Sequence, residues 1–315
     1  MPDSNFSMPE RGLQLSFIKS WFISGLLILV MVVGLHRPLR KMDDRVPRAP
    51  ASVAMEFVPV ALIGSGPFMP VGAWELRADD PRLDGVSALV REGEEFLAIT
   101  DSGVTIRFPR PETASPMMRL SDLPSGPGSP TRKAGNDAEA MARDPHGRGW
   151  WVAFESVQQL RLFDEALART LAVVPLDGRR WAENGGVEGM AEQPGHLLLF
   201  AEQGDMVQRF DGRALAPWRI DSPGRLGDAA RLPDGRVLLL MRSLSPLGFS
   251  NGVALYDPGR GTTSWLGRLP LGHLDNAEGI AAEPGPDGVI RLWVVTDRDS
   301  RARGRTLLAA FDWTP

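Results

Sequence analysis

Short runs of apolar residues, four to six long, recur along the chain after residue 54, separated by Gly, Pro, Asp and Asn. No long stretch in this part of the sequence places apolar residues at helical spacing. Short apolar runs bounded by turn-forming residues are typical of β-strands. Residues 54–315 are therefore predicted to form an all-β domain.

The strand-like runs repeat as units. Each of five related segments precedes a second apolar run: DGVSALV (84–90), NDAEAMA (136–142), GGVEGMA (185–191), LGDAARL (226–232) and NAEGIAA (276–282). Aligned at one position in each, they lie 52, 49, 40 and 50 residues apart. A period of about 40–50 residues with several strands per unit is typical of a β-propeller, whose four-stranded blades bury their faces against one another. A β-sandwich with accidental similarity among its strands is the alternative.

Five blades are readable, and strand-like segments at 54–63 and 72–77 either close the ring or add a degenerate sixth blade. Segment 109–135 is rich in Pro, Ser and Gly. It is interpreted as a hairpin excursion, with a lid over the ring as the alternative. The tryptophans are expected to pack between blades rather than to form a sugar-stacking platform. They include Trp150, Trp151, Trp181, Trp218, Trp265, Trp293 and Trp313.

The N-terminal region has a different pattern. Residues 17–35 contain one charged residue, Lys19, and nineteen residues of helix reach about 28 Å, enough for a hydrocarbon core. The segment is predicted to be an uncleaved signal anchor between a tail (1–16) and a linker (36–53). A cleaved signal peptide and a soluble core helix are the alternatives. Lys and Arg are more numerous after the segment than before it, which alone would place residues 54–315 in the cytoplasm.

Composition narrows the chemistry. The chain has no cysteine, so thiol nucleophiles, thiolate metal sites and disulfides are excluded. Four histidines leave little room for a multi-histidine metal centre. Residues 51–315 carry 28 Lys and Arg against 35 Asp and Glu, and this acidic balance argues against nucleic-acid binding.

Two columns of polar residues run through the repeats. The first column, at the head of each first strand, consists of Ser87, Glu139, Glu188, Asp228 and Glu278. The second column, at the end of each second strand, consists of Asp101, Glu155, Glu202, Arg242 and Asp297. In an antiparallel hairpin these two positions are neighbours. If the first strand is innermost, both columns converge on one mouth of the central channel.

Eight carboxylates around one opening repel one another unless a cation binds, protons are retained or water screens them. Hard oxygen ligands suit Ca²⁺ or Mg²⁺. All eight acids are candidate ligands: Asp101, Glu139, Glu155, Glu188, Glu202, Asp228, Glu278 and Asp297. The alternative is that these acids cap loop amides or bond across blades without any ligand.

Four segments carry a resemblance to a known family: Asp84 to Leu89, Asn184 to Ala191, Asp228 to Arg242, and Asn276 to Ala281. Together they resemble the phytase-like family, described as "esterase-like activity of phytase", over roughly residues 70–312. Ala88 and Ala140 stand where the pattern has glycine. The resemblance implies a β-propeller, usually exported, with hydrolase or esterase activity. It favours a periplasmic domain despite the charge count.

Two short motifs receive ordinary structural interpretations. Residues 145–148 (PHGR) share part of a histidine acid phosphatase signature, but the spacing fails and a hairpin turn is predicted. Residues 248–252 match G-x-S-x-G, but strand-like residues follow where a nucleophile elbow needs a helix.

The sequence thus predicts a monomeric, membrane-tethered, periplasmic propeller that hydrolyses small ester or phosphoester substrates at a cation-binding acidic mouth. Glu188, Glu278, Glu139 and Asp228 are the first-choice ligands or general bases, with Glu188 and Glu278 the catalytic candidates. Arg242 would steady an anionic group or the transition state. A non-catalytic propeller that binds a protein or small ligand is the rival hypothesis. A lactonase-type propeller, which also holds a metal with carboxylates, is a third.

Overall fold

The computed structural model describes residues 48–64, 66–124, 135–176, 186–218, 220, 224–298 and 305–315. The predicted tail, the anchor at 17–35 and most of the predicted linker lie outside these ranges. Within them, no helix is long and apolar enough to cross a membrane. The first strand begins at Ala51, inside the segment predicted to be linker.

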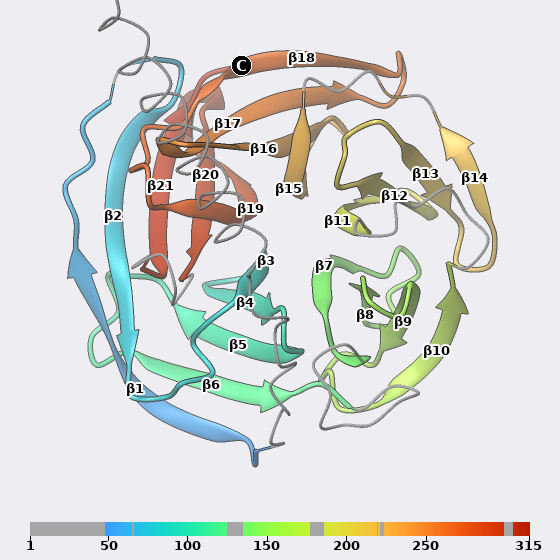
Figure 1. Cartoon of the computed structure of the whole chain (residues 1–315), viewed down its shortest axis with the longest axis horizontal. Helices are drawn as coiled ribbons and strands as arrows, with labels where there is room; N and C mark the ends of the chain where they lie inside the picture. Colours follow the sequence, from blue (N-terminus) through green and yellow to red (C-terminus); the bar gives the residue numbers. More distant parts are fainter. Residues whose placement is uncertain are drawn as a thin grey trace, which may run out of the picture. The chain divides into compact units, whose positions relative to one another are not determined.

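Nearly all regular structure in the described residues is antiparallel β-sheet, as predicted (Figure 1). The first group of four strands contains β3 (Val86–Glu92), β4 (Glu95–Thr100), β5 (Val104–Pro109) and β6 (Met117–Asp122). The second contains β7 (Ala138–Arg143), β8 (Trp150–Phe154), β9 (Gln159–Phe163) and β10 (Thr170–Pro175). The third contains β11 (Val187–Gln193), β12 (His196–Ala201), β13 (Val207–Phe210) and β14 (Leu215–Trp218). The fourth contains β15 (Arg225–Arg231), β16 (Val237–Ser245), β17 (Gly248–Asp257) and β18 (Thr262–Arg268).

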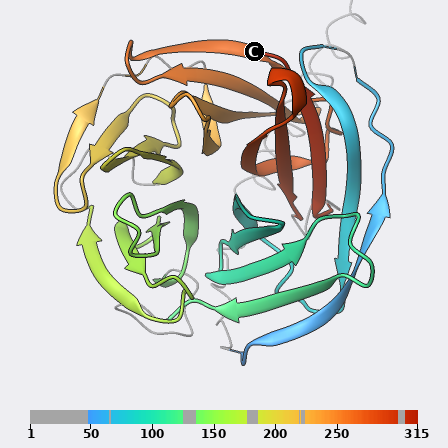
Figure 2. The ribbon, with the colours of Figure 1, turned by 180° about the vertical axis from the view of Figure 1, so that it is seen from behind.

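The fifth group joins the two ends of the described chain. It contains β19 (Asn276–Pro284), β20 (Ile290–Asp297), β21 (Leu307–Trp313) and, as its outer strand, β2 (Met69–Ala78). A short 3₁₀ turn at Pro286–Gly288 connects β19 to β20. Strand β1 (Ala51–Pro59) lies outside both β2 and β6 and pairs with each, so it links the outer edges of the fifth and first sheets (Figure 2). The N-terminal strands therefore close the ring, and β1 joins the fifth and first groups into one nine-stranded sheet. The described residues hold five groups of four strands rather than six, and each group is called a sheet below.

The first strand of each sheet is the innermost one. β3, β7, β11, β15 and β19 each contact the next around the axis, and β19 contacts β3 (Figure 1). Neighbouring sheets are joined by apolar side chains. Trp150 packs with Leu97 of the first sheet, Trp151 with Phe210 of the third, and Trp293 with Phe96 of the first.

These contacts confirm the predicted inter-blade role of three tryptophans. Trp313 is also buried, but Trp265 is 50% exposed, so the packing prediction is wrong for that residue. Trp181 and the side chain of Trp218 lie outside the description.

Every innermost strand carries a β-bulge at the same place. The pairing register shifts by one residue around Ser87, Glu139, Glu188, Gly227 and Glu278. A bulge inserts one extra residue, bends the strand and re-aims the side chain at that point. The bulges therefore give the five inner strands an equivalent position near the axis.

Three local predictions can also be compared with the structure. His146 lies in the turn between β7 and β8, where its backbone N–H donates to the Asp144 carboxylate at 3.2 Å, as a hairpin turn requires. Gly248 to Gly252 lie in β17, and the strand continues to Asp257 where a nucleophile elbow would need a helix. Part of the predicted excursion 109–135 is the regular strand β6, and residues 125–134 lie outside the description.

Candidate functional site

A cavity of about 330 Å³ lies where the bulges of the inner strands meet the ends of the second strands. Its lining includes nine of the ten predicted column residues: Ser87, Asp101, Glu139, Glu155, Glu188, Glu202, Arg242, Glu278 and Asp297. The two columns do converge on one place, as the hairpin argument predicted. We call this space the acidic cavity.

Hairpin geometry explains why the two columns meet. The backbone N–H groups of Asp101, Glu155 and Glu202 donate to carbonyl oxygens two residues before the bulges, at 2.7, 2.9 and 3.2 Å. In the fourth and fifth sheets, Arg242 pairs with Arg225 and Asp297 with Asn276 at the same position. Each second-column residue is thereby held beside the bulge of its own sheet.

Asp228 is the column residue that the structure places elsewhere. The bulge of the fourth sheet is Gly227, and Asp228 follows it. The corresponding residues in the other sheets are small: Ala88, Ala140, Gly189 and Gly279. Asp228 is 1% exposed and is not part of the cavity lining. The alignment was therefore one residue out of register in this repeat.

The Asp228 carboxylate has a structural role. It accepts backbone N–H groups from Ile280 at 2.8 Å, from Leu89 at 3.3 Å and from Ala229 at 2.7 Å. Burial raises the pKa of Asp228 well above its ordinary value, although these hydrogen bonds oppose the shift. Asp228 thus links β15 to β19 and, across the axis, to β3.

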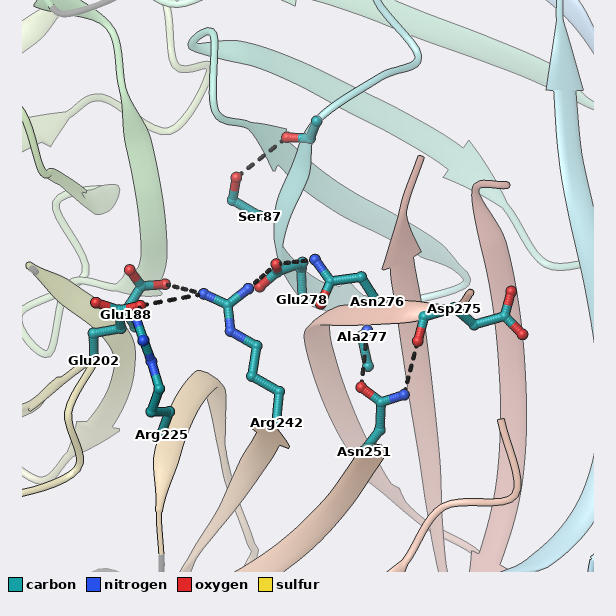
Figure 3. A network of polar contacts seen from close by, with 11 residues as sticks. Ser87, Glu188, Glu202, Arg225, Arg242, Asn251, Asp275, Asn276, Ala277 and Glu278 are labelled. Carbon is teal, nitrogen blue, oxygen red and sulfur yellow. Dashed lines mark hydrogen bonds and ion pairs between the residues drawn. The ribbon is translucent and has the colours of Figure 1, made fainter. Parts of the chain in front are cut away.

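Arg242 neutralises one half of the acidic cavity (Figure 3). Its guanidinium forms a close ion pair with Glu278, and its Nη2 lies 3.7 Å from Glu202 Oε1 and 3.9 Å from Glu188 Oε2. Gly227 lies directly beside this ion pair, and a Cβ atom there would approach the backbone carbonyl oxygen of Ala277 to 3.1 Å. The fourth sheet therefore supplies a cation where other sheets supply an acid.

Two further side chains complete this half. Arg225 forms a close ion pair with Glu202, and Asn276 Nδ2 donates to Glu278 Oε1 at 2.5 Å. Both occupy the position two residues before the bulge. This position forms a third column of equivalent residues, which was not predicted from the sequence. Glycine at this position in two of the repeats, Gly85 and Gly186, hides the equivalence in the sequence.

The opposite half of the cavity gathers carboxylates. One oxygen each from Asp137, Glu139 and Glu155 lies within 4.8 Å of the others, which is close enough for a shared cation. Asp137 also occupies the position two residues before a bulge, and its equivalence to Arg225 and Asn276 is hidden in the sequence by the same two glycines. These oxygens are the hard ligands that Ca²⁺ and Mg²⁺ prefer.

The electrostatic surroundings of Glu139 and Glu188 differ. Desolvation raises the pKa of Glu139 well above its ordinary value, and the carboxylates of Glu188, Asp137, Asp101 and Glu155 raise it further. The cavity is therefore expected to retain protons near Glu139 when no cation balances its charge.

For Glu188, desolvation is again the largest cause, and nearby acids add to it. Arg242 and Arg225 oppose the shift, and the pKa of Glu188 rises to about 8. A carboxyl with this pKa exchanges its proton near neutral pH, where general acid–base catalysis is most effective.

Comparison with known proteins places the chain in a family. Residues 81–300 match the phytase-like family model, described as "esterase-like activity of phytase". No curated protein matches the sequence.

Several solved structures are similar to this chain. A Bacteroides thetaiotaomicron VPI-5482 protein of unknown function is 10% identical, with a TM-score of 0.50 over 84% of this chain and 76% of that one. Glutaminyl cyclase from Myxococcus xanthus is 17% identical, with a TM-score of 0.49 over 82% of this chain and 99% of the cyclase. A putative 6-phosphogluconolactonase from Bacteroides uniformis ATCC 8492 is 15% identical, with a TM-score of 0.40 over 79% and 93% of the two chains. Identities this low concern the fold alone.

The matched range begins just before the first repeat and extends past the strand that supplies Asp297. It includes all five bulges and every predicted residue that lines the acidic cavity. Because the match spans more than half of the sequence, the chain belongs to the phytase-like family.

Proposed function

We propose that this protein hydrolyses ester or phosphoester substrates in the acidic cavity with the help of a divalent cation, Ca²⁺ or Mg²⁺. The observation that supports this most directly is the convergence of nine column residues on one cavity of about 330 Å³. Carboxylates crowd one half of that cavity, and an arginine bound to carboxylates occupies the other. A charged substrate and a cation therefore have separate places to bind.

The donor set fits a hard cation. Asp137, Glu139 and Glu155 would hold it, because one carboxylate oxygen from each lies within 4.8 Å of the others. Such an ion would supply Lewis-acid polarisation of the carbonyl or phosphoryl group. Of the other predicted ligands, Asp101 and Asp297 also line the cavity and remain candidate outer ligands. Glu188, Glu202 and Glu278 line it as well, but they are ion-paired with Arg242.

The chain's own residues would supply positioning and proton transfer. Arg242 would bind the anionic oxygen of a substrate or transition state with the N–H groups not committed to glutamates. Glu188, with a pKa of about 8, would deliver or accept the proton of the reacting group. Glu278 is held by both Arg242 and Asn276, so its role is to fix the direction of the guanidinium.

The proposal predicts cation-dependent hydrolysis by the purified full-length chain. Assays against panels of esters and phosphoesters, with Ca²⁺, Mg²⁺ or a chelator, should reveal an activity that chelation abolishes. Glu139→Gln and Glu155→Gln should each lower kcat/KM about 100-fold or more, because each removes a ligand charge.

Glu165→Gln is the matched control, since Glu165 is an exposed glutamate paired with Arg143 away from the cavity. It should leave the activity unchanged. Inactivity on every substrate, with no thermal shift on addition of either cation, would instead support the non-catalytic binding propeller.

We further propose that residues 17–35 tether the domain to a membrane and that residues 54–315 are periplasmic. The apolar run at 17–35 and the family resemblance support this arrangement. A reporter that functions only in the periplasm, fused after Pro315, should be active. An inactive periplasmic reporter together with an active cytoplasmic one would reverse the orientation.

A further inference from the structure

The fourth sheet differs from the others beside the acidic cavity. In the first three sheets the second strand ends just before its cavity residue, at Thr100, Phe154 or Ala201. In the fourth sheet, β16 continues past Arg242, and its pairing with β17 extends from Arg242–Asn251 to Ser245–Gly248. This extension builds a wall that the first three sheets lack.

A second cavity, of about 590 Å³, lies along this extension, and we call it the arginine groove. Arg242 lines both the groove and the acidic cavity, and Arg225 and Arg268 also line the groove. The two spaces therefore meet at Arg242. A volume of this size falls in the range of sites for small organic ligands.

The walls of the groove combine apolar surface with positive charge. Trp265 is 50% exposed and Leu244 is 73% exposed, and Phe249 adds a second aromatic ring. Trp265 packs over Gly252, where a Cβ atom would lie 2.1 Å from the indole Cη2. Only glycine at 252 leaves room for the indole in this position.

Arg268 supplies a positive charge that no acidic side chain of the described residues neutralises. Arg242 and Arg225 are ion-paired with glutamates, whereas the guanidinium of Arg268 has no hydrogen-bond or ion-pair partner among the described residues. An exposed aromatic ring beside an arginine of this kind suits a flat apolar group bearing an anion, through stacking and charge-assisted hydrogen bonds.

We propose that the arginine groove binds an aromatic ring carrying a carboxylate or other anionic substituent. If the protein is a hydrolase as proposed above, the groove would hold the aromatic part of the substrate, and the bond to be hydrolysed would lie beside Arg242. Binding of the ring itself needs neither the cation nor hydrolysis. The groove would thus give the enzyme a preference for anionic aryl esters.

Calorimetric titration of the full-length chain with 2-naphthoate, in chelator, tests binding apart from catalysis. The uncharged isostere 2-naphthamide should bind about 10-fold more weakly than naphthoate, because it lacks the anion. Arg268→Gln should weaken naphthoate about 10-fold and naphthamide less than about 2-fold, whereas Trp265→Ala should weaken both. Arg260→Gln, which changes an exposed arginine of the same sheet that lies outside the groove, should alter neither.

Equal affinities for the two probes, or unchanged naphthoate binding by Arg268→Gln, would overturn the proposal. Glu139→Gln separates the two proposals, since it should abolish hydrolysis and leave naphthoate binding intact. If hydrolysis is found, Arg268→Gln should raise KM for an anionic aryl ester and leave kcat nearly unchanged. Naphthoate binding without any hydrolysis would support the groove and contradict only the hydrolase.

Discussion

Replacement of Asp228 by alanine is expected to lower the free energy of unfolding by about 3 kcal/mol or more, because two cross-strand N–H groups lose their acceptor in a buried place. These are the N–H groups of Leu89 and Ile280, which belong to the first and fifth sheets. Asp228 is 1% exposed, so water cannot replace the carboxylate without entering the centre of the ring. Urea unfolding followed by tryptophan fluorescence measures the change.

Asparagine at position 228 should have an intermediate effect. Its carbonyl oxygen can still accept hydrogen bonds from the N–H groups of Leu89 in β3 and Ile280 in β19. Its NH₂ group would face the N–H of Ala229, and two donors cannot form a hydrogen bond with each other. The expected order of stability is therefore Asp, then Asn, then Ala.

Asp234→Ala is the matched control within the same sheet. Asp234 accepts hydrogen bonds from Arg236 in an exposed turn, and its loss should cost less than about 1 kcal/mol. If Asp228→Ala unfolds at the same urea concentration as the wild type, the carboxylate does not hold the sheets together.

The sequence was sufficient to predict the ring and the meeting of the two columns, because both follow from a repeated hairpin. Glu155 and Glu188, for example, need only an inner first strand to face the same opening. The partner of β2 was not predictable, since its pairing with β21 joins residues more than 200 positions apart and leaves no local signal. Only the closed ring shows that β2 completes the fifth sheet.

The position of the bulge in the fourth sheet explains why Asp228 was wrongly predicted to line the cavity. Asp228 is followed by Ala229, as Glu188 is followed by Gly189, so no residue near Asp228 indicates that the bulge lies at Gly227. Because Asp228 lies one residue after the bulge and not at it, its carboxylate accepts buried backbone hydrogen bonds and does not line the cavity.

Arg225 and Asp137 were missed for a related reason. Their position carries two glycines, an arginine, an asparagine and an aspartate across the five sheets, so composition does not mark it as a column. Only backbone pairing shows that these residues are equivalent.

Arg242 is the second residue whose loss should have a large effect. Arg242→Met keeps much of the side-chain volume but leaves Glu188, Glu202 and Glu278 without a shared cation. Removal of one partner from a buried charge cluster should lower the free energy of unfolding by about 3 kcal/mol or more. The loss should depend on pH. Arg242 lowers the pKa of Glu188, so the variant should raise that pKa above its wild-type value of about 8.

The direction follows from proton linkage. A carboxyl whose pKa is higher in the folded protein than in the unfolded chain holds its proton in the native state while the unfolded chain releases it, so stability falls as pH rises above about 4.5. The variant should therefore differ least from the wild type near pH 5 and most at pH 8 and above. Urea titrations at pH 5 and pH 8 measure the difference.

Two controls separate charge from packing. Arg242→Lys keeps the positive charge and should lose less stability at pH 8 than Arg242→Met. It should still be less stable than the wild type, because an ammonium group cannot contact three carboxylates as the planar guanidinium does. Arg119→Met removes an exposed arginine paired with Glu95 at 2.6 Å and should change stability little at either pH. An equal loss for Arg242→Met at pH 5 and pH 8 would assign the effect to packing. A loss that grows with pH and is reversed by Ca²⁺ would mean that a cation can take the place of the guanidinium, as expected if the acidic cavity is built to bind positive charge.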